Sequence, residues 1–409
     1  MLAPCRACNF ILPKKWWLCV ARCGAGGLIA DPRLGHACEA AFVMARILFI
    51  TSAHPGGSGF IGAGEGICES SLRTLVAAGY EVHVLCFASL RQQPNPDVVA
   101  LCASYRTLAQ SGMQSVFGIL RGWRWGSLLA PWFFTRCSPS NLRVVSTALA
   151  DTEFKEVWID FPSSLGFAPY LGDRFVSYFV HDVVSQKVGR RPLLAFLARR
   201  VEAIEQRLAA FSRRCYVLSD KDGHLIRQLG YAGDIVVSPP MNVHAGLVEG
   251  GRPAASIVSE FSEQRNLVFF GNMRRPENHW SMMYFIAFRY RSIRRICPDV
   301  RLWILGIAPR RSLRLLSYWV GGVEVVGAVD DPVLVFQAAT LCVVPLRFGA
   351  GVKIKVLQML DAGATVVSTT VGAEGIVAKD SLVVADDAEF VTAVCSLMAS
   401  QVSSRKAST

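Results

Sequence analysis

Residues 341–358 read LCVVPLRFGAGVKIKVLQ, a short apolar run followed by a glycine-rich loop and the start of a helical segment. The apolar run predicts a buried strand at 341–345. Glycines allow the backbone to approach an anion, and N–H groups at the start of a helix attract negative charge. Lys353 and Lys355 add positive charge at the same place. The segment therefore predicts a diphosphate-binding unit, with an ordinary turn and solvated lysines as the alternative.

Short apolar runs and longer helical segments alternate on both sides of this unit. In the later half of the chain, strands are expected at 266–270, 301–305, 323–326, 341–345, 365–369 and 382–385. In the earlier half, strands are expected at 46–51, 81–87, 155–160, 174–180 and 213–218, with a long helix at about 191–211 that carries arginines on its outer face. Such alternation is typical of parallel sheets connected by helices. The predicted fold class is α/β with two doubly wound domains.

The chain of 409 residues is longer than one hydrophobic core usually requires. The sequence Ser238-Pro239-Pro240 marks the break, because prolines lack a backbone donor and favour extended backbone. The expected division is an extension at 1–43, an N-terminal domain at 44–240, a linker at 241–262, a C-terminal domain at 263–400 and a tail at 401–409. Ligands of open parallel sheets bind beyond the carboxyl ends of the strands, so the site is expected in a cleft between the two domains.

The extension at 1–43 is rich in potential metal ligands, namely Cys5, Cys8, Cys19, Cys23, His36 and Cys38. A zinc site is one hypothesis, but the spacing has no regular finger or ribbon pattern. The sequence from Met44 onward looks like the opening of a cytosolic α/β enzyme. Residues 1–43 are therefore expected to be poorly ordered or to lie upstream of the true start, with a signal peptide as a weaker alternative.

The formal net charge of +12 favours an anionic partner such as a nucleotide or a phospholipid headgroup. Nucleic acid is not expected, because no RNA-binding aromatic signature or recognition-helix pattern is found. Charged residues interrupt every apolar run before the ~20 residues that a membrane span needs. Cysteines in apolar runs, such as Cys86, Cys215 and Cys342, are typical of free thiols in a reducing compartment. The predicted location is the cytoplasm.

Residues 117–134 mix aromatic and basic side chains, including Trp123, Arg124 and Trp125. Such a surface can lie at a bilayer interface, with indoles at the headgroups and arginines on anionic lipid. A peripheral contact with the inner face of the membrane and a lipid-linked acceptor would fit this interpretation. The alternative is core packing with surface arginines.

Five ordered motifs carry a family resemblance. They are FFGNM at 269–273 with Asn278, WILG at 303–306, VVGAVD at 325–330, CVVPLR at 342–347 with the following GAGVKIKVLQ loop, and GATVVSTTVGAEG at 363–375. Together they resemble the retaining GT-B glycosyltransferases of the group 1 family (GT4-like). The resemblance is good over about 266–376 and looser over 44–240.

The resemblance implies a GT-B fold, in which two Rossmann-like domains face a cleft. The implied activity is a hexosyltransferase-type transfer (EC 2.4) from a UDP- or GDP-sugar to a glycan or lipid-linked acceptor, with retention of configuration, in surface polysaccharide biosynthesis. It implies no metal and no cofactor, because a basic residue and backbone dipoles neutralise the leaving phosphate. Front-side attack assisted by that phosphate is implied, without a protein nucleophile.

The site residues follow from the same resemblance. The expected donor-binding residues are Gly57, Gly271, Asn272, Arg274, Val329, Gly349, Gly351, Lys353, Lys355, Gln358 and Glu374. In this assignment the base lies near Gly327 to Val329, the ribose near Gln358 and the diphosphate near the two lysines. His181 is the expected catalytic residue, close to the acceptor or the transferred sugar, although a lone histidine is often structural.

Three positions depart from the family pattern. Ala350 and Gln358 stand where many members have glutamates, and Asn278 stands where many have a phosphate-binding lysine. Arg274 or Arg275 could supply the missing charge. These departures leave open an alternative function, a non-catalytic GT-B protein that binds a nucleotide sugar or partners an active transferase. The helix expected at about 387–400 leaves little chain for the return helix with which GT-B chains usually finish.

Overall fold

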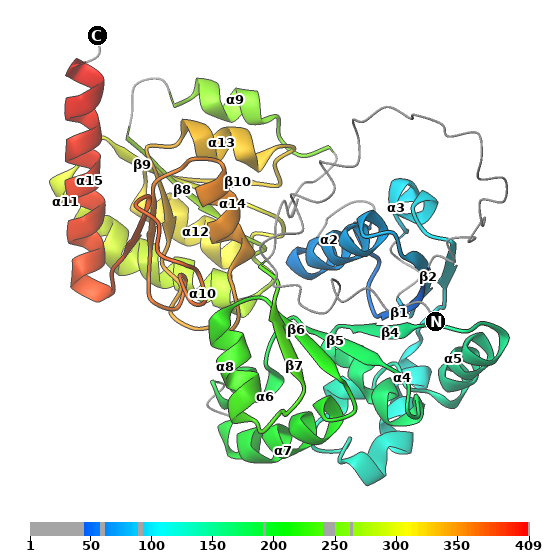
Figure 1. The fold of residues 1–409 in the computed structure, drawn as a ribbon. Helices are drawn as coiled ribbons and strands as arrows, with labels where there is room; N and C mark the ends of the chain where they lie inside the picture. The colour runs from blue at the N-terminus through cyan, green and yellow to red at the C-terminus, as the bar shows by residue number, and fades with distance from the viewer. Residues whose placement is uncertain are drawn as a thin grey trace, which may run out of the picture. The chain divides into compact units, whose positions relative to one another are not determined.

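A computed structural model describes residues 45–57, 62–88, 93–190, 194–239, 250–261 and 265–407. These residues form an N-terminal and a C-terminal lobe, each built on one parallel sheet (Figure 1). The hypotheses about 1–43, including zinc binding, lie outside the described residues, as do 58–61 of the first glycine loop and 241–249 of the predicted linker. None of the described helices is both long enough and apolar enough to cross a bilayer.

The N-terminal sheet has seven parallel strands in the order β3-β2-β1-β4-β5-β6-β7. They are β1 Arg46–Thr51, β2 Glu81–Cys86, β3 Ser104–Thr107, β4 Glu156–Asp160, β5 Val176–Val180, β6 Arg214–Val217 and β7 Asp234–Val237. The five strands expected from the sequence are present. The expectation missed β3 and β7, because both lie at sheet edges and their side chains are largely exposed, so neither strand is a buried apolar run.

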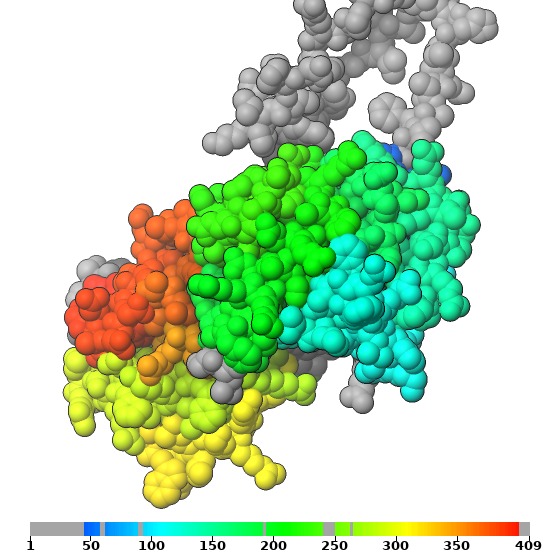
Figure 2. Space-filling model, turned by 90° about the horizontal axis from the view of Figure 1, so that it is seen from below, coloured from blue at the N-terminus to red at the C-terminus, as the bar shows by residue number. Residues whose placement is uncertain are grey.

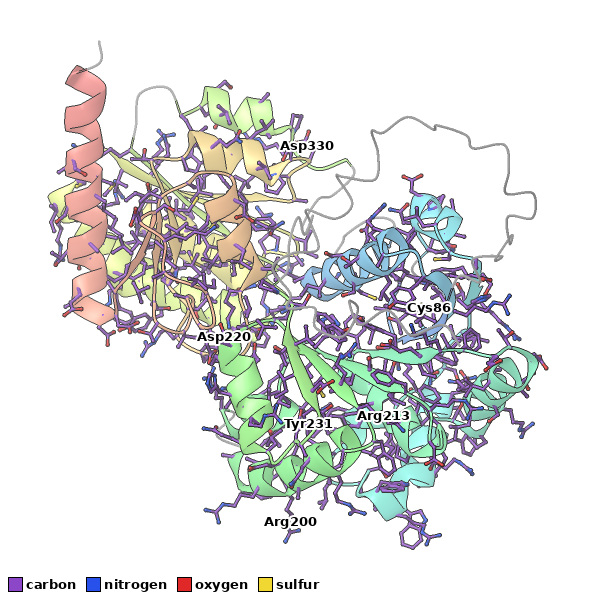
Figure 3. All side chains as sticks on the ribbon, viewed as in Figure 1. Cys86, Arg200, Arg213, Asp220, Tyr231 and Asp330 are labelled. Carbon is purple, nitrogen blue, oxygen red and sulfur yellow. The ribbon has the colours of Figure 1, made fainter. Side chains whose placement is uncertain are left out.

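Helices and short helical turns connect these strands. They are α2 Ala63–Ala77, α3 Pro96–Ala100, α4 Gly112–Arg121, η1 Gly122–Trp125, η2 Pro131–Phe133, α5 Pro139–Asp151, η3 Pro162–Tyr170, α6 Val184–Gly189, η4 Ala195–Leu197, α7 Ala198–Ala209 and α8 Asp220–Gln228. The helix expected at 191–211 is shorter, since η4 is a 3-10 turn and α7 begins at Ala198. Arg200 projects outward from α7, whereas Cys86 lies in the lobe interior (Figure 3).

The C-terminal sheet has six parallel strands in the order β10-β9-β8-β11-β12-β13. They are β8 Arg265–Phe270, β9 Val300–Leu305, β10 Val323–Gly327, β11 Leu341–Val344, β12 Val366–Ser368 and β13 Leu382–Val384. The helices of this lobe are α9 Ala254–Ser259, α10 Pro276–Tyr284, η5 Phe285–Tyr290, α11 Arg291–Ile296, α12 Arg311–Val320, α13 Pro332–Ala338, α14 Ile354–Asp361 and α15 Asp387–Ala407. All six expected strands are confirmed.

Two boundaries differ from the sequence expectation. Residues 254–259 of the predicted linker form α9, and Ala254 and Ile257 are buried in the core of the C-terminal lobe. The last helix does not end near residue 400 but continues to Ala407, and it packs against α11 and β12. In both cases the packing partners are distant in sequence, so local composition could not reveal them.

Both sheets have the doubly wound order, which reverses direction between β1 and β4 and between β8 and β11. The central strands β1 and β8 are buried except at their first residues, Arg46 and Arg265. Phe49 of β1 and Phe269 of β8 have no exposed surface. All eight described cysteines are free thiols. Ligands of such sheets bind at the carboxyl ends of the strands beside the point of reversal. The fold therefore predicts that functional side chains follow β1, β4, β8 and β11.

Candidate functional site

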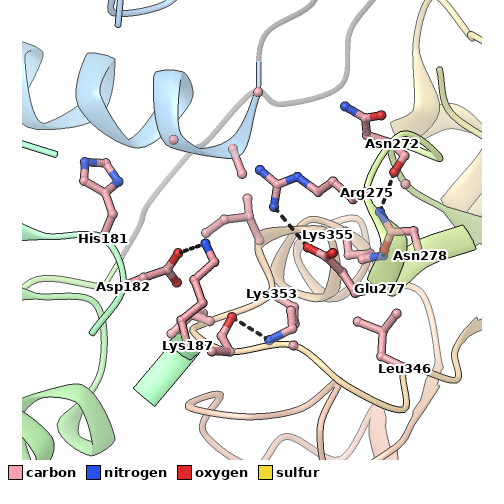
Figure 4. A pocket seen from close by; sticks show the side chains of 18 of the residues that line it. His181, Asp182, Lys187, Asn272, Arg275, Glu277, Asn278, Leu346, Lys353 and Lys355 are labelled. Carbon is pink, nitrogen blue, oxygen red and sulfur yellow. Dashed lines mark hydrogen bonds and ion pairs between the residues drawn. The ribbon is translucent and has the colours of Figure 1, made fainter. Parts of the chain in front are cut away.

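A cavity of about 1120 Å³ lies between the carboxyl ends of the two sheets. Phe161 and His181, which follow β4 and β5, line it from the N-terminal lobe. Gly271 and Leu346, which follow β8 and β11, line it from the C-terminal lobe. Figure 4 shows that His181 enters this space from the N-terminal lobe, and Lys353 and Lys355 from the C-terminal lobe. The volume is large enough for a ligand of nucleotide-sugar size.

Three helices of eight or more residues begin at the cavity. Gly62 and Ala63 at the start of α2, Arg275 and Pro276 at the start of α10, and Lys353 at the start of α14 all line it. No side chain of the described residues caps any of these three helices. Their first N–H groups and the positive ends of their dipoles therefore favour an anion in the cavity.

The charged side chains of the cavity reinforce this preference. The basic ones are Lys187, Arg190, Arg275, Lys353 and Lys355, and the acidic ones are Asp182 and Glu277. Asp182 accepts a hydrogen bond from Lys187 at 2.9 Å, and Glu277 lies 3.9 Å from Arg275 (Figure 4). Both carboxylates are thus next to a cation. The cavity keeps a net positive charge, which suits a diphosphate.

Lys355 lies in the first turn of α14, and its ammonium reaches across to α10. Its Nζ donates a hydrogen bond to Asn278 Oδ1 at 2.6 Å and lies 4.4 Å from the centre of the Phe269 ring. Burial, together with the charges of the neighbouring Lys353 and Arg275, lowers the pKa of Lys355 to about 7. A Cβ on Gly271 would lie 3.0 Å from this Nζ, so glycine leaves the room that the ammonium occupies. The ammonium is poorly solvated and is available to a bound anion.

Lys353 is held by backbone groups of the glycine loop. Its Nζ donates to the carbonyls of Ala350 at 3.0 Å and Gly351 at 2.5 Å, and it lies 4.0 Å from Glu374. Burial lowers its pKa to about 8, although Glu374 opposes this shift. The side chain is only 10% exposed. Lys353 therefore fixes the shape of the loop as well as adding charge beside it.

Glu374 joins the two lobes rather than lining the cavity. Both of its oxygens accept from the Arg190 guanidinium at 2.6 Å, and Lys221 of α8 donates to it at 3.2 Å. Arg190 also donates to the Gly349 carbonyl at 2.6 Å. A bidentate arginine–carboxylate pair is geometrically specific. The glycine loop of one lobe is thereby tied to α6 and α8 of the other.

A hydrogen bond and a stacked ring fix the position of His181. Its Nε2 lies 2.5 Å from Asp160 Oδ1 at the end of β4, where the carboxylate is fully buried. The Phe161 ring stacks on the imidazole at 4.1 Å and 3°. Phe161 has a φ of 69°, a conformation that costs energy for a residue with a Cβ. Because a carboxylate oxygen accepts, Nε2 carries the proton, and Nδ1 has no hydrogen-bond partner among the described residues.

The cavity brings together most of the residues expected from the sequence. Those that line it are His181, Gly271, Asn272, Gly349, Lys353, Lys355 and Gln358. Five others do not line it. Gly57 donates to the His54 carbonyl in a tight turn. Arg274 is exposed and does not line the cavity, whereas the next residue, Arg275, does.

Val329 is buried and pairs with Arg252, and Glu374 forms the interlobe ion pairs. Gly351 lies beside the other lobe: it has a φ of +75°, and a Cβ there would lie 2.1 Å from Asp182 Oδ1. The small residue therefore permits the close approach of the two lobes.

Sequence reasoning missed Asp160 and Arg190. Asp160 ends the expected strand at 155–160, so its position at a carboxyl edge was a usable signal. No comparable signal marked Arg190, because its partners Gly349 and Glu374 are more than 150 residues away, at separations of 159 and 184. The contact exists only after both lobes have folded.

Comparisons with known proteins agree with this geometry. Solved structures that cover most of the chain have the same pair of facing parallel-sheet lobes. The fold is GT-B. Sucrose-phosphate synthase from Thermosynechococcus elongatus aligns over 88% of this chain and 90% of its own, with 16% identity and a TM-score of 0.63. Anabaena HepE in complex with UDP-glucose aligns over 88% and 90%, with 12% identity and a TM-score of 0.57.

A glycosyltransferase from Rickettsia africae ESF-5 aligns over 87% of this chain and 88% of its own, with 10% identity and a TM-score of 0.56. At these identities the likeness concerns the fold alone. The family model for glycosyl transferases group 1 matches residues 264–400, which is nearly all of the C-terminal lobe of this GT-B chain. No curated protein matches the sequence.

Proposed function

We propose that the protein is a glycosyltransferase that moves a sugar from a UDP- or GDP-sugar to a glycan or lipid-linked acceptor. One observation carries the proposal: Lys353, Lys355 and the uncapped starts of α2, α10 and α14 surround a single cavity. The group 1 match at 264–400 covers the lobe that holds both lysines, and the fold neighbour HepE is known in complex with UDP-glucose. A nucleotide diphosphate satisfies the charge of this cavity.

In this reaction the site has to stabilise negative charge. As the bond between the sugar and the diphosphate breaks, negative charge grows on the leaving phosphate oxygen. Lys355 would neutralise that charge directly, because its ammonium is poorly solvated, and Lys353 would hold the glycine loop against the diphosphate. These cations do the work that a divalent ion would otherwise perform. We therefore expect transfer to proceed in the presence of EDTA.

We further propose that transfer retains configuration. The carboxylates that line the cavity, Asp182 and Glu277, each lie beside a cation, which disfavours their use as nucleophiles. In a front-side reaction, the acceptor oxygen forms the new bond to the sugar as the bond to the diphosphate breaks. The acceptor proton passes to the leaving phosphate oxygen. His181 would position the acceptor or the sugar through its free Nδ1.

A panel of nucleotide sugars tests the proposal. The purified chain is incubated with each donor, and both hydrolysis and transfer to glycan and lipid-linked acceptors are measured. Turnover that disappears in Lys353→Ala supports an enzyme. Tight binding of nucleotide sugars without turnover of any donor would instead support the non-catalytic alternative, to which Ala350, Gln358 and Asn278 point.

Donor affinity is expected to fall as the pH rises above neutrality. The pKa of Lys355 is about 7 and that of Lys353 about 8, and a bound diphosphate raises both because it favours the charged forms. Below these values both lysines are charged and affinity is greatest. Above them, binding must recruit protons, so the Kd should rise up to about tenfold per pH unit for each proton taken up.

Calorimetry with UDP-glucose between pH 6 and 9, in buffers of different ionisation enthalpy, measures this proton uptake. A nucleotide sugar is preferred to UDP because its diphosphate does not titrate in this range. In the Lys355→Met variant, the Kd should depend less steeply on pH. A Kd that is constant over this range would argue against direct contact between the lysines and the diphosphate.

The N-terminal lobe offers a surface for a lipid-linked acceptor. Helix α4 exposes Met113, Val116, Phe117 and Leu120, of which Met113 is 70% exposed, and Gly118 is its only buried residue. Trp123 and Leu128 beyond it are also exposed. The alternative of core packing does not describe these side chains. We propose that this α4 surface touches the inner face of the membrane.

Leu120→Ser with Trp123→Ser is expected to reduce binding to anionic vesicles about tenfold or more, because two exposed apolar anchors are removed. Hydrolysis of a soluble donor should stay unchanged, since neither residue lines the cavity. Vesicle sedimentation measures the first quantity, and Val377→Ser, which also changes an exposed apolar side chain, is the control. Equal sedimentation of variant and control would contradict a role for the α4 surface.

A further inference from the structure

Helix α12 of the C-terminal lobe carries apolar side chains on its outer face. Leu315, Tyr318 and Trp319 are 60%, 83% and 74% exposed, whereas Leu313 and Ser317 are buried against the lobe. A surface helix usually turns charged and polar residues to water. At 3.6 residues per turn these three side chains lie on one side of the helix, opposite its buried pair. Packing in the core of the lobe therefore does not account for these three apolar side chains.

The segment that contains α11 and α12 is rich in arginine. Residues 289–314 contain eight arginines and a single acid, Asp299. Helix α11 lies beside the end of α12, because Arg294 donates to the carbonyls of Val320 and Gly321, both at 3.0 Å. Figure 2 shows the yellow part of the chain, which includes α12, projecting at the edge of the molecule. We call Arg311, Arg314, Leu315, Tyr318 and Trp319 the α12 surface.

Several of these charges are not neutralised within the protein. Among the described residues, Arg291, Arg295 and Arg311 are exposed and have neither a hydrogen-bond acceptor nor an ion-pair partner. By contrast, Arg289 is paired with Asp387 at 2.7 Å. An uncompensated basic surface of this kind attracts an anionic partner.

We propose that the α12 surface docks on an anionic lipid bilayer. Tyr318 and Trp319 would lie at the level of the headgroups, Leu315 would enter the acyl boundary, and Arg311 and Arg314 would contact lipid phosphates. A nucleic acid would satisfy the arginines but would leave Leu315 in water. A bilayer satisfies both the charge and the apolar face. This contact is separate from that of the α4 surface and does not depend on the proposed transfer reaction.

The test uses the full chain with the α4 surface silenced by Leu120→Ser and Trp123→Ser, so that the remaining binding reports on α12. Phosphatidylcholine vesicles with about a third phosphatidylglycerol are compared with pure phosphatidylcholine. Tyr318→Ser with Trp319→Ser, and separately Arg311→Gln with Arg314→Gln, should each reduce sedimentation with anionic vesicles about tenfold. Val377→Ser, an equally exposed apolar change in the same lobe, should have no effect.

A second measurement uses the intrinsic fluorescence of Trp319. The difference spectrum between the protein and Trp319→Phe should shift to shorter wavelength with anionic vesicles and not with neutral ones. Sedimentation that is unaffected by both α12 variants, or a Trp319 spectrum that does not shift, would overturn the proposal. Tighter binding to a labelled DNA or RNA duplex than to the vesicles, abolished by the arginine variant, would overturn it in favour of nucleic acid. Donor hydrolysis, assayed in parallel, reports separately on the proposed function.

Discussion

Replacing Lys355 with methionine is expected to lower kcat/KM for the nucleotide sugar by about 10²- to 10³-fold. The ammonium lies 2.6 Å from Asn278 Oδ1 in a cavity where three helices begin, and it has little water around it. A charge in such a site stabilises the developing negative charge of the leaving phosphate more strongly than it would in water. Methionine fills a similar volume without the charge.

The same variant is expected to be more stable than the natural protein at pH 6. Burial lowers the pKa of Lys355 to about 7, so below that value the folded protein carries a charge that is costly to desolvate. Between pH 7 and the unfolded pKa of 10.5, the folded state is neutral while the unfolded state is still protonated. The stability of the natural protein therefore rises with pH over this window. The gain in stability of Lys355→Met over the natural protein should therefore be largest at low pH.

Initial rates and thermal unfolding at pH 6 and pH 9 measure the two effects. Lys379→Met is the matched control, because Lys379 is an exposed lysine that pairs with Asp361 at 3.3 Å and does not line the cavity. If Lys355→Met loses activity and gains stability, the charge of Lys355 serves function and not folding. If Lys355→Met retained activity, or if it unfolded more easily at pH 6, the lysine would be structural and the proposed diphosphate site would be wrong.

Replacing His181 with alanine is expected to lower kcat by about 10²- to 10³-fold, because positioned histidines contribute in this range. Asp160 holds the imidazole with Nε2 toward the carboxylate and Nδ1 free. His224→Ala is the control, since His224 is exposed on α8, does not line the cavity and bonds to the Asp220 carbonyl of its own helix at 2.7 Å. Activity within twofold of the natural protein would make His181 a packing residue.

Asp160→Asn tests the positioning role separately. The asparagine amide can donate to Nε2, which moves the imidazole proton to Nδ1 and removes the free acceptor of the ring. We expect kcat to fall while the KM for the donor changes little, since the diphosphate contacts lie in the other lobe. The ¹⁵N shifts of the His181 ring report which nitrogen is protonated. A ring that keeps its proton on Nε2 in Asp160→Asn would contradict this account.

Local sequence was enough to determine the alternation of buried strands and helices, since apolar runs such as NLVFF at 266–270 have few other ways to be buried. It also determined that a glycine loop with two lysines follows β11, because the loop and the helix start are contiguous in the chain. The sequence pattern did not predict the edge strands β3 and β7, because an edge strand can form without a buried apolar run.

Only the tertiary structure decided which of these features meet. Lys355 reaches Asn278 across 77 residues, His181 reaches Asp160 across 21, and Arg190 reaches Glu374 across 184. It also decided that Leu315, Tyr318 and Trp319 face water, whereas their apolar character alone predicts burial. Local propensity depends on neighbours in the chain, but a site depends on side chains that packing brings together from different strands and lobes. The positive cavity is therefore a property of the folded pair of sheets, for which the sequence supplied the separate parts.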